Sequence, residues 1–330
     1  MSLKLHFLFR KKLPQYNSIE ELYDTVIQQL SKMNTVTVVE VPHAGAGLSS
    51  LLKNLKAFKP VKNTITHITG DVHYMALVTG SKTVLTIHDV KSIIKGPWLK
   101  QQLIKMLWFW LPALCVNKIT VISKFSKEEL SKVIPFSKQK IEVVYNPVNY
   151  SLRYVSKSFN AERPKILLIG TKPNKNLERT LKALEYIPCS VTIIGKLSHE
   201  QMALLERYNI EFENRFHIPY EDIVQAYVDC DLLVFASTYE GFGMPIIEAQ
   251  AVGRPVITSN IGAMKEVAGD SALLVDPYNE AEISQAVQSL ISDLYAVQTL
   301  VEKGLENVKR FQLDKIVNDY KAVYKTVMHG

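Results

Sequence analysis

The sequence is poor in cysteine and has no long uninterrupted apolar run. Its 330 residues include three cysteines, Cys115, Cys189 and Cys230, and an odd, widely spaced set does not predict a disulfide framework or a metal site. We expect all three to be small buried apolar residues in a reducing compartment. The most apolar run, 106–116, is about half of the roughly 20 residues that span a bilayer. It also contains Pro112, so a membrane span is not predicted.

The first residues lack the pattern of a secretion signal. Residues 1–9 have no basic segment followed by a long apolar stretch and a small-residue cleavage site, so we interpret 3–9 as a first strand. The composition, 47% hydrophobic and 22% charged, is typical of a globular protein, and the length favours two domains. We expect a cytoplasmic protein, with peripheral binding to the inner face of the membrane as an open alternative.

Acidic residues are scarce in the first half of the chain. Residues 1–150 contain 20 Lys and Arg against 9 Asp and Glu, a net charge of +11, whereas residues 151–330 contain 19 against 23, a net charge of −4. A basic half favours an anionic partner, either a membrane surface or a phosphorylated substrate; a solvated basic surface is the alternative. No nucleic-acid-binding module is recognisable, so nucleic acid is not an expected partner.

Short β-branched runs alternate with amphipathic segments along the whole chain. The runs are residues 35–41, 83–87, 118–122, 165–169, 191–194, 231–236 and 255–258. Such strands between helical segments predict an α/β protein with parallel sheets covered on both faces. The periodicity is lost between Asn146 and Arg163, where we place a hinge between domains 1–150 and 151–330. The last helix, near 313–327, could pack back on the first domain.

The segment 237–253, STYEGFGMPIIEAQAVG, predicts a strand end, a glycine turn and a helix. Gly241 and Gly243 permit positive φ and a close approach of a ligand to the backbone, and Pro245 suits the first turn of a helix. A helix N-terminus that faces a cleft favours anions. Glu240 precedes the turn and Glu248 lies in the helix, so one carboxylate can face a sugar while the other accepts hydrogen bonds from ribose hydroxyls.

Glu240 and Glu248, which enclose GFGMP, closely resemble the paired-Glu signature of family 4 glycosyltransferases. The resemblance continues through residues 218–237 and 255–279; it departs at Lys265, where proline is common. It implies a GT-B fold, in which two Rossmann-like lobes with parallel sheets face each other across a cleft. The first lobe would bind the acceptor and the second lobe the nucleotide-sugar donor. It also implies hexosyl transfer with retention of configuration and no metal or other cofactor.

A second loop resembles the family after the strand KILLIG. Lys172 and Lys175 follow its glycine turn, at the sheet edge where phosphates bind. The resemblance implies that Lys175 contacts the donor diphosphate, that Glu240 orients the sugar and that Glu248 holds the ribose. The further donor-binding residues expected are Gly170, Thr171, Lys172, Asn176, Gly241, Phe242, Gly243, Met244 and Pro245. The arginine common in this loop is missing, so either Lys172 replaces it or the second cation is absent.

His88 is the candidate catalytic residue of the first half, because it follows the apolar run TVLTI and resembles the family's histidine at the transferred sugar. His67, Asp71 and His73 are close in sequence, but without a further ligand cluster we do not predict a metal site. Ser123 and Ser126 are explained by helix capping, and a ligand contact is the alternative.

The first half departs from the family after its first strand. Residues 7–26 contain no glycine, although relatives have a glycine-rich loop there, and Arg10, Lys11 and Lys12 offer a basic mouth instead. A further segment mixes Trp98, Trp108, Phe109 and Trp110 with Lys95, Lys100 and Lys105, which suits either a membrane interface or a core helix.

The sequence therefore predicts a retaining glycosyltransferase that transfers a sugar to a glycan or a lipid-linked oligosaccharide in the synthesis of a cell-surface polysaccharide. A sugar-nucleotide epimerase on the same fold and a non-catalytic assembly subunit are the alternatives. An epimerase would form product from the nucleotide sugar alone, and an assembly subunit would be insensitive to substitution of Glu240.

Overall fold

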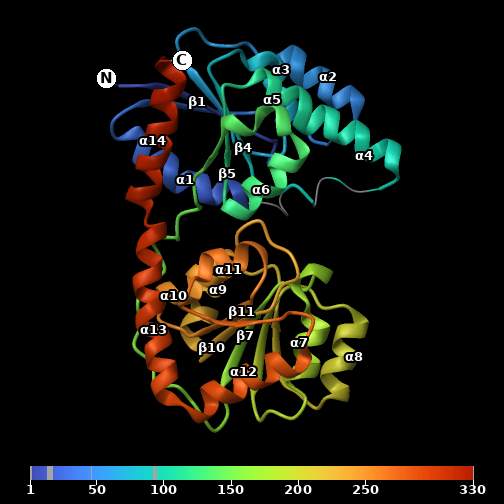
Figure 1. Ribbon diagram of the computed structural model, residues 1–330, viewed down its shortest axis with the longest axis vertical. Helices are drawn as coiled ribbons and strands as arrows, with labels where there is room; N and C mark the ends of the chain where they lie inside the picture. Colours follow the sequence, from blue (N-terminus) through green and yellow to red (C-terminus); the bar gives the residue numbers. More distant parts are fainter. Residues whose placement is uncertain (1, 13–17, 46, 92–93, 95, 330) are drawn as a thin grey trace. The chain divides into compact units, whose positions relative to one another are not determined.

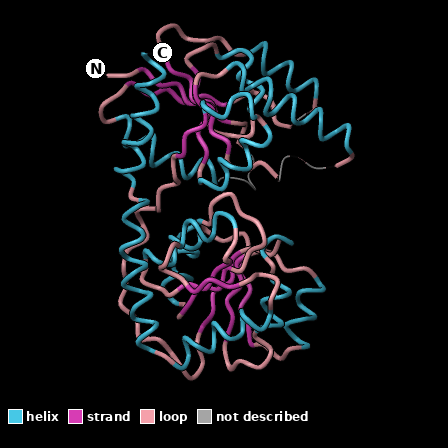
Figure 2. Tube along the Cα trace, viewed as in Figure 1, coloured by secondary structure: helices cyan, strands magenta, loops and turns pink. Residues whose placement is uncertain are grey.

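The computed structural model describes residues 2–12, 18–45, 47–91, 94 and 96–329. It divides into two compact units, unit 1 (Met1–Pro147 and Leu313–Gly330) and unit 2 (Val148–Gln312). The last helix thus belongs to unit 1, although it lies at the end of the range expected for the second domain. In both units the strands form a central layer enclosed by helices (Figure 2).

Unit 1 contains a parallel six-stranded sheet with the order β2-β1-β3-β4-β5-β6. Its strands are β1 (Lys4–Phe9), β2 (Thr35–Glu40), β3 (Ile65–Ile68), β4 (Thr83–Ile87), β5 (Lys118–Val121) and β6 (Ile141–Val143). All five residues of β4 are buried, as its apolar run predicts. The run 35–41 was expected to be a buried strand and this is wrong for β2, because it lies at the sheet edge and stays largely exposed.

Helices cover both faces of the unit 1 sheet (Figure 1). They are α1 (Ser18–Ser31), α2 (Leu48–Ala57), α3 (Ala76–Thr79), α4 (Trp98–Ile104), α5 (Leu111–Cys115), α6 (Lys124–Val133) and α14 (Leu313–His329). Short 3-10 turns η1 (His73–Met75) and η3 (Pro135–Lys140) and a π-helical segment η2 (Lys105–Trp110) complete the unit. Helices α1 and α14 share one face, where the hydroxyls of Tyr23 and Tyr320 are 2.7 Å apart.

Unit 2 has a second parallel six-stranded sheet, with the order β12-β11-β10-β7-β8-β9. Its strands are β7 (Lys165–Ile169), β8 (Ser190–Ile194), β9 (Glu211–Arg215), β10 (Leu232–Phe235), β11 (Val256–Ser259) and β12 (Leu273–Val275). Its helices are α7 (Leu177–Ala183), α8 (His199–Arg207), α9 (Tyr220–Asp229), α10 (Met244–Ala251), α11 (Gly262–Ala268), α12 (Glu280–Ser292) and α13 (Leu294–Val308), with the turns η4 (Pro173–Lys175) and η5 (Lys309–Phe311). The two sheets confirm the predicted two-lobe α/β architecture.

The segment that follows unit 1 is attached to unit 2 over most of its length. The backbone N–H of Val155 donates to the carbonyl of Val252 at 3.3 Å, and Arg254 donates to the carbonyl of Val155 at 2.9 Å. Lys157 forms an ion pair of 2.8 Å with Asp231. Residues 148–163, most of the expected hinge, are therefore part of unit 2 rather than a free linker.

Two predictions about apolar residues need correction or refinement. Cys189 and Cys230 are buried, but Cys115 at the end of α5 is exposed, so the prediction of three buried cysteines is wrong for it. Of the aromatic segment, Phe109 is buried and Trp110 donates to the carbonyl of Val133 at 2.9 Å, which is core packing. Trp98 remains 68% exposed, and Lys95 lies outside the described residues. Within the described part of the chain, no helix has the length and apolar character needed to cross a bilayer.

Candidate functional site

The candidate site in unit 2 lies where the order of strands reverses between β7 and β10. From β7 the chain continues to β8 and β9 on one side, whereas β10 to β12 extend to the other side. Ligands of such sheets bind outside the carboxyl ends of the strands at this switch point. The loops that leave β7 and β10 meet there, and the backbone N–H of Thr238 donates to the carbonyl of Asn174 at 2.8 Å. The predicted donor-binding residues are thus brought together.

Lys175 and Glu240 are in direct contact at the centre of this site. The ammonium of Lys175 donates to the carboxylate of Glu240 at 2.7 Å, with 20% and 16% of the two side chains exposed. The same ammonium lies 4.7 Å from the centre of the Phe235 ring, at the end of β10. Asn174 also donates to the Glu240 carboxylate, at 3.2 Å. A cation and a carboxylate are therefore held together in a partly dehydrated place, where each interacts strongly with an added charge.

The glycine after β7 is required by the position of Lys175. Gly170 has a φ of +92°, and a Cβ atom there would lie 2.7 Å from Cγ of Lys175. Any other side chain would be strained and would displace the lysine. Gly243 before α10 has a φ of +109°, and Pro245 follows in the first turn of that helix. Gly243 thus adopts the positive φ that the sequence allows, whereas Gly241 in the same turn does not.

Asn176 connects the loops of the site. Its amide nitrogen donates to the carbonyls of Ala236 at 3.0 Å and Pro277 at 2.6 Å, and its oxygen accepts from Arg179. Its side-chain oxygen and nitrogen are thus both used within the protein, and its left-handed φ of +59° is one that asparagine adopts more readily than most residues. The predicted contact of its side chain with the donor stays a prediction.

Glu248 is held by two tyrosines that sequence reasoning missed. Tyr227 donates to one of its oxygens at 2.6 Å, and Tyr220 donates to the other at 3.4 Å. Burial raises the pKa of Glu248, while the two hydroxyls and the charge of Lys175 act in the opposite direction. The tyrosines lie seven residues apart on α9, so they share one face of the helix. That spacing was a signal, but the partner of the face depends on tertiary packing.

The remaining residues of the two loops contribute in different ways. Phe242 is 3% exposed and packs edge-on against Phe311, with ring centres 5.5 Å apart, so only its backbone is available to a ligand. Thr171 donates to the carbonyl of Lys196 at 2.7 Å. Lys172 is exposed and makes no ion pair with the residues that the structure describes. Gly241 and Met244 are half-buried.

In unit 1, His88 follows β4 as predicted. Its Nε2 lies 2.9 Å from the carbonyl oxygen of Thr69, so this nitrogen carries the proton and donates. Burial lowers the pKa of His88, which favours the neutral ring at neutral pH and leaves Nδ1 as an acceptor. His88 belongs to unit 1 and the donor loops to unit 2, so its contact with the transferred sugar stays a prediction.

His67 and His73 of unit 1 are structural. His67 is fully buried, with Nδ1 2.7 Å from the hydroxyl of Tyr324 and Nε2 2.7 Å from that of Thr86. Burial and the nearby His88 lower its pKa to about 3. His73 bonds to the carbonyl of Trp108 at 2.9 Å, and Asp71 binds Arg10. No group of three or more His, Cys, Asp or Glu side chains among the described residues is placed to hold a metal ion.

The helix that follows β5 starts as expected. Oγ of Ser123 accepts from the backbone N–H of Ser126 at 2.9 Å, so capping explains both serines. The three basic residues after β1 were expected to be available to a ligand, and this is wrong for Arg10. Arg10 is neutralised by Glu20 at 3.0 Å and Asp71 at 3.2 Å, whereas Lys11 and Lys12 are exposed.

These features define a class: two parallel α/β units, one of which has a glycine turn, a lysine and paired carboxylates at its switch point. Two family models match the chain, "Glycosyl transferases group 1" over residues 155–306 and "Glycosyltransferase Family 4" over residues 20–152. The chain belongs to the family 4 glycosyltransferases and has the GT-B fold.

Named relatives and solved structures agree with this assignment. An uncharacterized glycosyltransferase of Methanocaldococcus jannaschii is 26% identical over 73% of this chain and 68% of its own length. The O-antigen chain mannosyltransferase B of Escherichia coli is 28% identical over 63% of this chain and 60% of its own length. The structure of HepE of Anabaena in complex with UDP and glucose has a TM-score of 0.78 at 16% identity, and it covers 97% of this chain and 99% of that one. The alignments with the two relatives thus leave about a third or more of each relative unmatched.

Proposed function

We propose that the protein is a retaining glycosyltransferase that transfers a hexose from a nucleotide-sugar donor to a glycan or lipid-linked acceptor in polysaccharide synthesis. The similarity to an O-antigen mannosyltransferase supports the polysaccharide. The complexes of HepE with UDP and with UDP-glucose support a nucleotide-sugar donor. The observation that carries the proposal is the contact between Lys175 and Glu240 at the switch point of unit 2.

The contact suits a reaction that separates charge. In glycosyl transfer the sugar becomes oxocarbenium-like, and the diphosphate gains negative charge as it departs. Lys175 is placed to bind the diphosphate and Glu240 to orient the sugar. The two groups are 2.7 Å apart, so a bound diphosphate competes with Glu240 for the ammonium. Glu248, which is held by Tyr227 and Tyr220, accepts hydrogen bonds from the ribose hydroxyls.

The bonding changes follow from retention. The bond between the anomeric carbon and the diphosphate oxygen breaks, and its electron pair leaves with the diphosphate. The acceptor oxygen bonds to the same face of that carbon, and its proton passes to the departing phosphate oxygen. Neutral His88 is expected at the sugar, where its Nδ1 can accept a hydrogen bond from a hydroxyl. A covalent intermediate on a carboxylate of the enzyme is the competing route, and trapping with a fluorinated donor sugar distinguishes the two.

No metal ion is needed in this proposal. Lys175 and backbone N–H groups at the start of α10 supply the positive charge that a metal ion would otherwise bring to the diphosphate. Transfer should therefore continue in excess EDTA. An activity that disappears with EDTA and returns with Mg²⁺ would contradict this part of the proposal.

Unit 1 is proposed to bind the cytoplasmic surface of a membrane. It contains 23 Lys and Arg against 11 Asp and Glu, which favours an anionic surface. Trp98 and Leu99 on α4 are 68% and 74% exposed, as expected of aromatic and aliphatic residues that enter a lipid headgroup region.

The first experiment is a thermal-shift and hydrolysis screen with UDP, GDP, ADP and dTDP sugars. We expect one of the nucleotide sugars to raise the melting temperature of the wild type. The same compound should not raise the melting temperature of Lys175→Ala. Lys172→Ala tests the second lysine of the same loop, which is an expected donor contact but is exposed and makes no ion pair with the described residues. Glu240→Ala should abolish slow hydrolysis of the donor.

Other outcomes identify the alternatives. Binding of no nucleotide would overturn the transferase and favour an assembly subunit. A new sugar nucleotide formed without any acceptor would indicate an epimerase. An equal loss in Lys172→Ala and Lys175→Ala would contradict the special position of Lys175.

A further inference from the structure

A large pocket lies at the carboxyl edge of the unit 1 sheet. It has a volume of about 730 Å³, within the range of about 300–1,000 Å³ that is typical of small-molecule sites. It is lined by residues that follow β1, β2 and β3 and by residues of α2, α4 and η2. Strand β1 lies between β2 and β3, so the chain reverses direction across the sheet there. This is the switch point of unit 1, where a ligand is expected.

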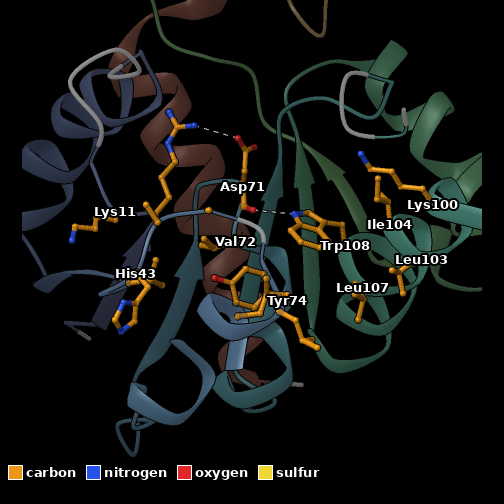
Figure 3. A pocket seen from close by; sticks show the side chains of 16 residues that line it. Lys11, His43, Asp71, Val72, Tyr74, Lys100, Leu103, Ile104, Leu107 and Trp108 are labelled. Atoms are coloured by element: carbon orange, nitrogen blue, oxygen red, sulfur yellow. Dashed lines mark hydrogen bonds and ion pairs between the residues drawn. The ribbon is translucent and has the colours of Figure 1, made fainter. Parts of the chain in front are cut away.

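The walls of the pocket are apolar. Val72, Leu103, Ile104 and Leu107 contribute aliphatic surface, and Figure 3 shows Leu103, Ile104 and Leu107 together on one side. Leu103 is 52% exposed, so its hydrocarbon faces solvent when nothing covers it. An exposed apolar concavity of this kind favours an apolar occupant.

Several polar groups that line the pocket already have partners within the protein. The indole N–H of Trp108 donates to the carbonyl of Asp71 at 3.0 Å, and the hydroxyl of Tyr74 accepts from Asn54 at 2.8 Å. The carboxylate of Asp71 is 3.2 Å from the guanidinium of Arg10. A sugar needs several donors and acceptors, and these groups are largely committed to the protein.

The rim of the pocket is cationic. Lys11 lies on one side and Lys100 on the opposite side (Figure 3). Both are exposed, and within the described ranges neither forms an ion pair. An apolar interior with two unneutralised ammonium groups at its edge complements a molecule that has a hydrocarbon chain and an anionic head.

We propose that this pocket holds the hydrocarbon chain of a phosphorylated amphipathic acceptor, with the phosphate at the rim formed by Lys11 and Lys100. The identification of the occupant as the acceptor rests on the proposed function, because it names the substrate that the transferase glycosylates. The proposed occupant is one lipid molecule bound as a monomer, which distinguishes this site from attachment of unit 1 to a membrane surface.

The test is calorimetric titration of the whole chain with hexyl and octyl phosphate below their critical micelle concentrations. Each buried methylene should raise affinity up to about fourfold, so octyl phosphate should bind up to about 15-fold more tightly than hexyl phosphate. Inorganic phosphate should not bind measurably. Equal affinities for the two chain lengths would overturn the proposal.

Matched leucines separate the pocket from general surface adhesion. Leu103 lines the pocket and is 52% exposed, and Leu52 on α2 lies outside the lining and is 49% exposed. Leu103→Asp should weaken octyl phosphate binding at least about tenfold, while Leu52→Asp should bind as the wild type does. Circular dichroism verifies that both variants fold. Equal losses in the two variants would show adhesion to the surface and not occupancy of the pocket.

The rim is tested with a neutral probe. Lys100→Gln should weaken binding of octyl phosphate but not of octyl glucoside, whose head has no charge. Loss of both ligands, or of neither, would overturn the assignment of the phosphate to the rim.

Failure of this inference is distinguishable from failure of the proposed function. Leu103→Asp should bind the nucleotide as the wild type does, because the donor loops belong to unit 2. Octyl phosphate binding without any nucleotide binding would leave a lipid site but overturn the transferase. If the nucleotide binds but hexyl and octyl phosphate bind equally, the proposed transferase stands and the proposed lipid pocket is overturned.

Discussion

The two units have the same kind of sheet, but different side chains lie at its carboxyl edge. These side chains are charged and polar in unit 2 and largely apolar in unit 1. In unit 2, two loops place Lys175 against Glu240, and a helix places Glu248 against two tyrosines. In unit 1, the edge has an apolar pocket with lysines at its rim, and His67 and His73 are buried against aromatic side chains. Unit 1 has 23 Lys and Arg against 11 Asp and Glu, whereas unit 2 has 16 against 21.

This difference leads us to expect that unit 2 binds the nucleotide and that unit 1 selects the acceptor. A nucleotide diphosphate presents the same charges whichever sugar it carries, so a polar arrangement that binds it can be shared throughout a family. An acceptor differs from one transferase to another, and the pocket proposed for the acceptor belongs to unit 1. The predictions below test whether chemistry depends on unit 2 while the choice of acceptor depends on unit 1.

Glu240→Gln should have the largest effect. We expect transfer to fall about 100- to 1,000-fold, the range for a group that acts on charge in the transition state. Nucleotide binding should stay equal or become tighter, because the ammonium of Lys175 loses the carboxylate that now lies 2.7 Å away. Steady-state kinetics and nucleotide calorimetry measure the two effects separately. Weaker nucleotide binding would contradict the competition between diphosphate and Glu240.

Gly170→Ala should lower the free energy of unfolding by about 1–3 kcal/mol, the range for a residue held in an unfavourable backbone region. The added Cβ would also lie 2.7 Å from Cγ of Lys175, so nucleotide affinity should fall as well. The control in unit 1 is Gly47→Ala, since Gly47 has a φ of −69° and no heavy atom within 4 Å of the added Cβ. Urea denaturation of both variants checks this, and equal stabilities would contradict it.

Tyr227→Phe should destabilise the protein by about 1.5–3 kcal/mol at neutral pH, because it removes a hydrogen bond to a carboxylate. Burial raises the pKa of Glu248, so its favourable contribution to folding is present at low pH and is lost as pH rises through its folded pKa. The Tyr227 hydroxyl favours the ionised carboxylate. The difference from wild type should thus shrink as pH falls through the folded pKa of Glu248, which lies above its ordinary value of 4.5.

Tyr220→Phe is the control for Tyr227→Phe, since its hydroxyl lies 3.4 Å from the same carboxyl group, and it should cost less. Denaturation at neutral pH and near pH 4 compares the two variants. A loss for Tyr227→Phe that does not depend on pH would indicate packing and not the hydrogen bond.

His67 should make unit 1 sensitive to acid. Its folded pKa is lowered from 6.5 to about 3, so its contribution to stability is complete above pH 6.5 and declines as pH falls toward 3. Between neutral pH and pH 5.5 the loss of stability from this residue is about 1.3 kcal/mol. The loss should disappear in His67→Gln and persist in His43→Gln, because His43 is exposed. Unfolding at the two pH values tests this, and equal acid sensitivity of the two variants would contradict it.

The smallest effect is expected at the membrane. Trp98→Ser should reduce sedimentation with anionic vesicles several-fold, because Trp98 is 68% exposed, without changing nucleotide binding. Added salt should weaken the binding of the wild type and of Trp98→Ser to the vesicles, since salt screens the attraction between a basic surface and anionic lipid. Tyr186→Ser in unit 2, at 86% exposure, is the control. Equal behaviour of the two variants would contradict a membrane role for α4.

Much of the fold and of the candidate site in unit 2 could be predicted from the sequence. Buried parallel strands read as continuous β-branched runs, and β4 and β10 formed where such runs occur. Gly170 and Gly243 were predictable because few other residues adopt positive φ. Tyr227 was not predicted, because its hydroxyl meets Glu248 only after α9 packs beside α10. Cys115 was misjudged because an apolar neighbourhood in sequence does not determine which side of a short helix faces solvent.

The sequence by itself determined the α/β alternation, the basic first half and the paired glutamates, because each depends on local spacing or on composition. Only the tertiary structure decided that Lys175 and Glu240, 65 residues apart, touch, since their contact requires β7 and β10 to be neighbours. It also decided that residues after β1, β2 and β3 enclose one apolar pocket with helices α2 and α4. A pocket has no local signature, because its walls are side chains that folding brings together from distant parts of the chain.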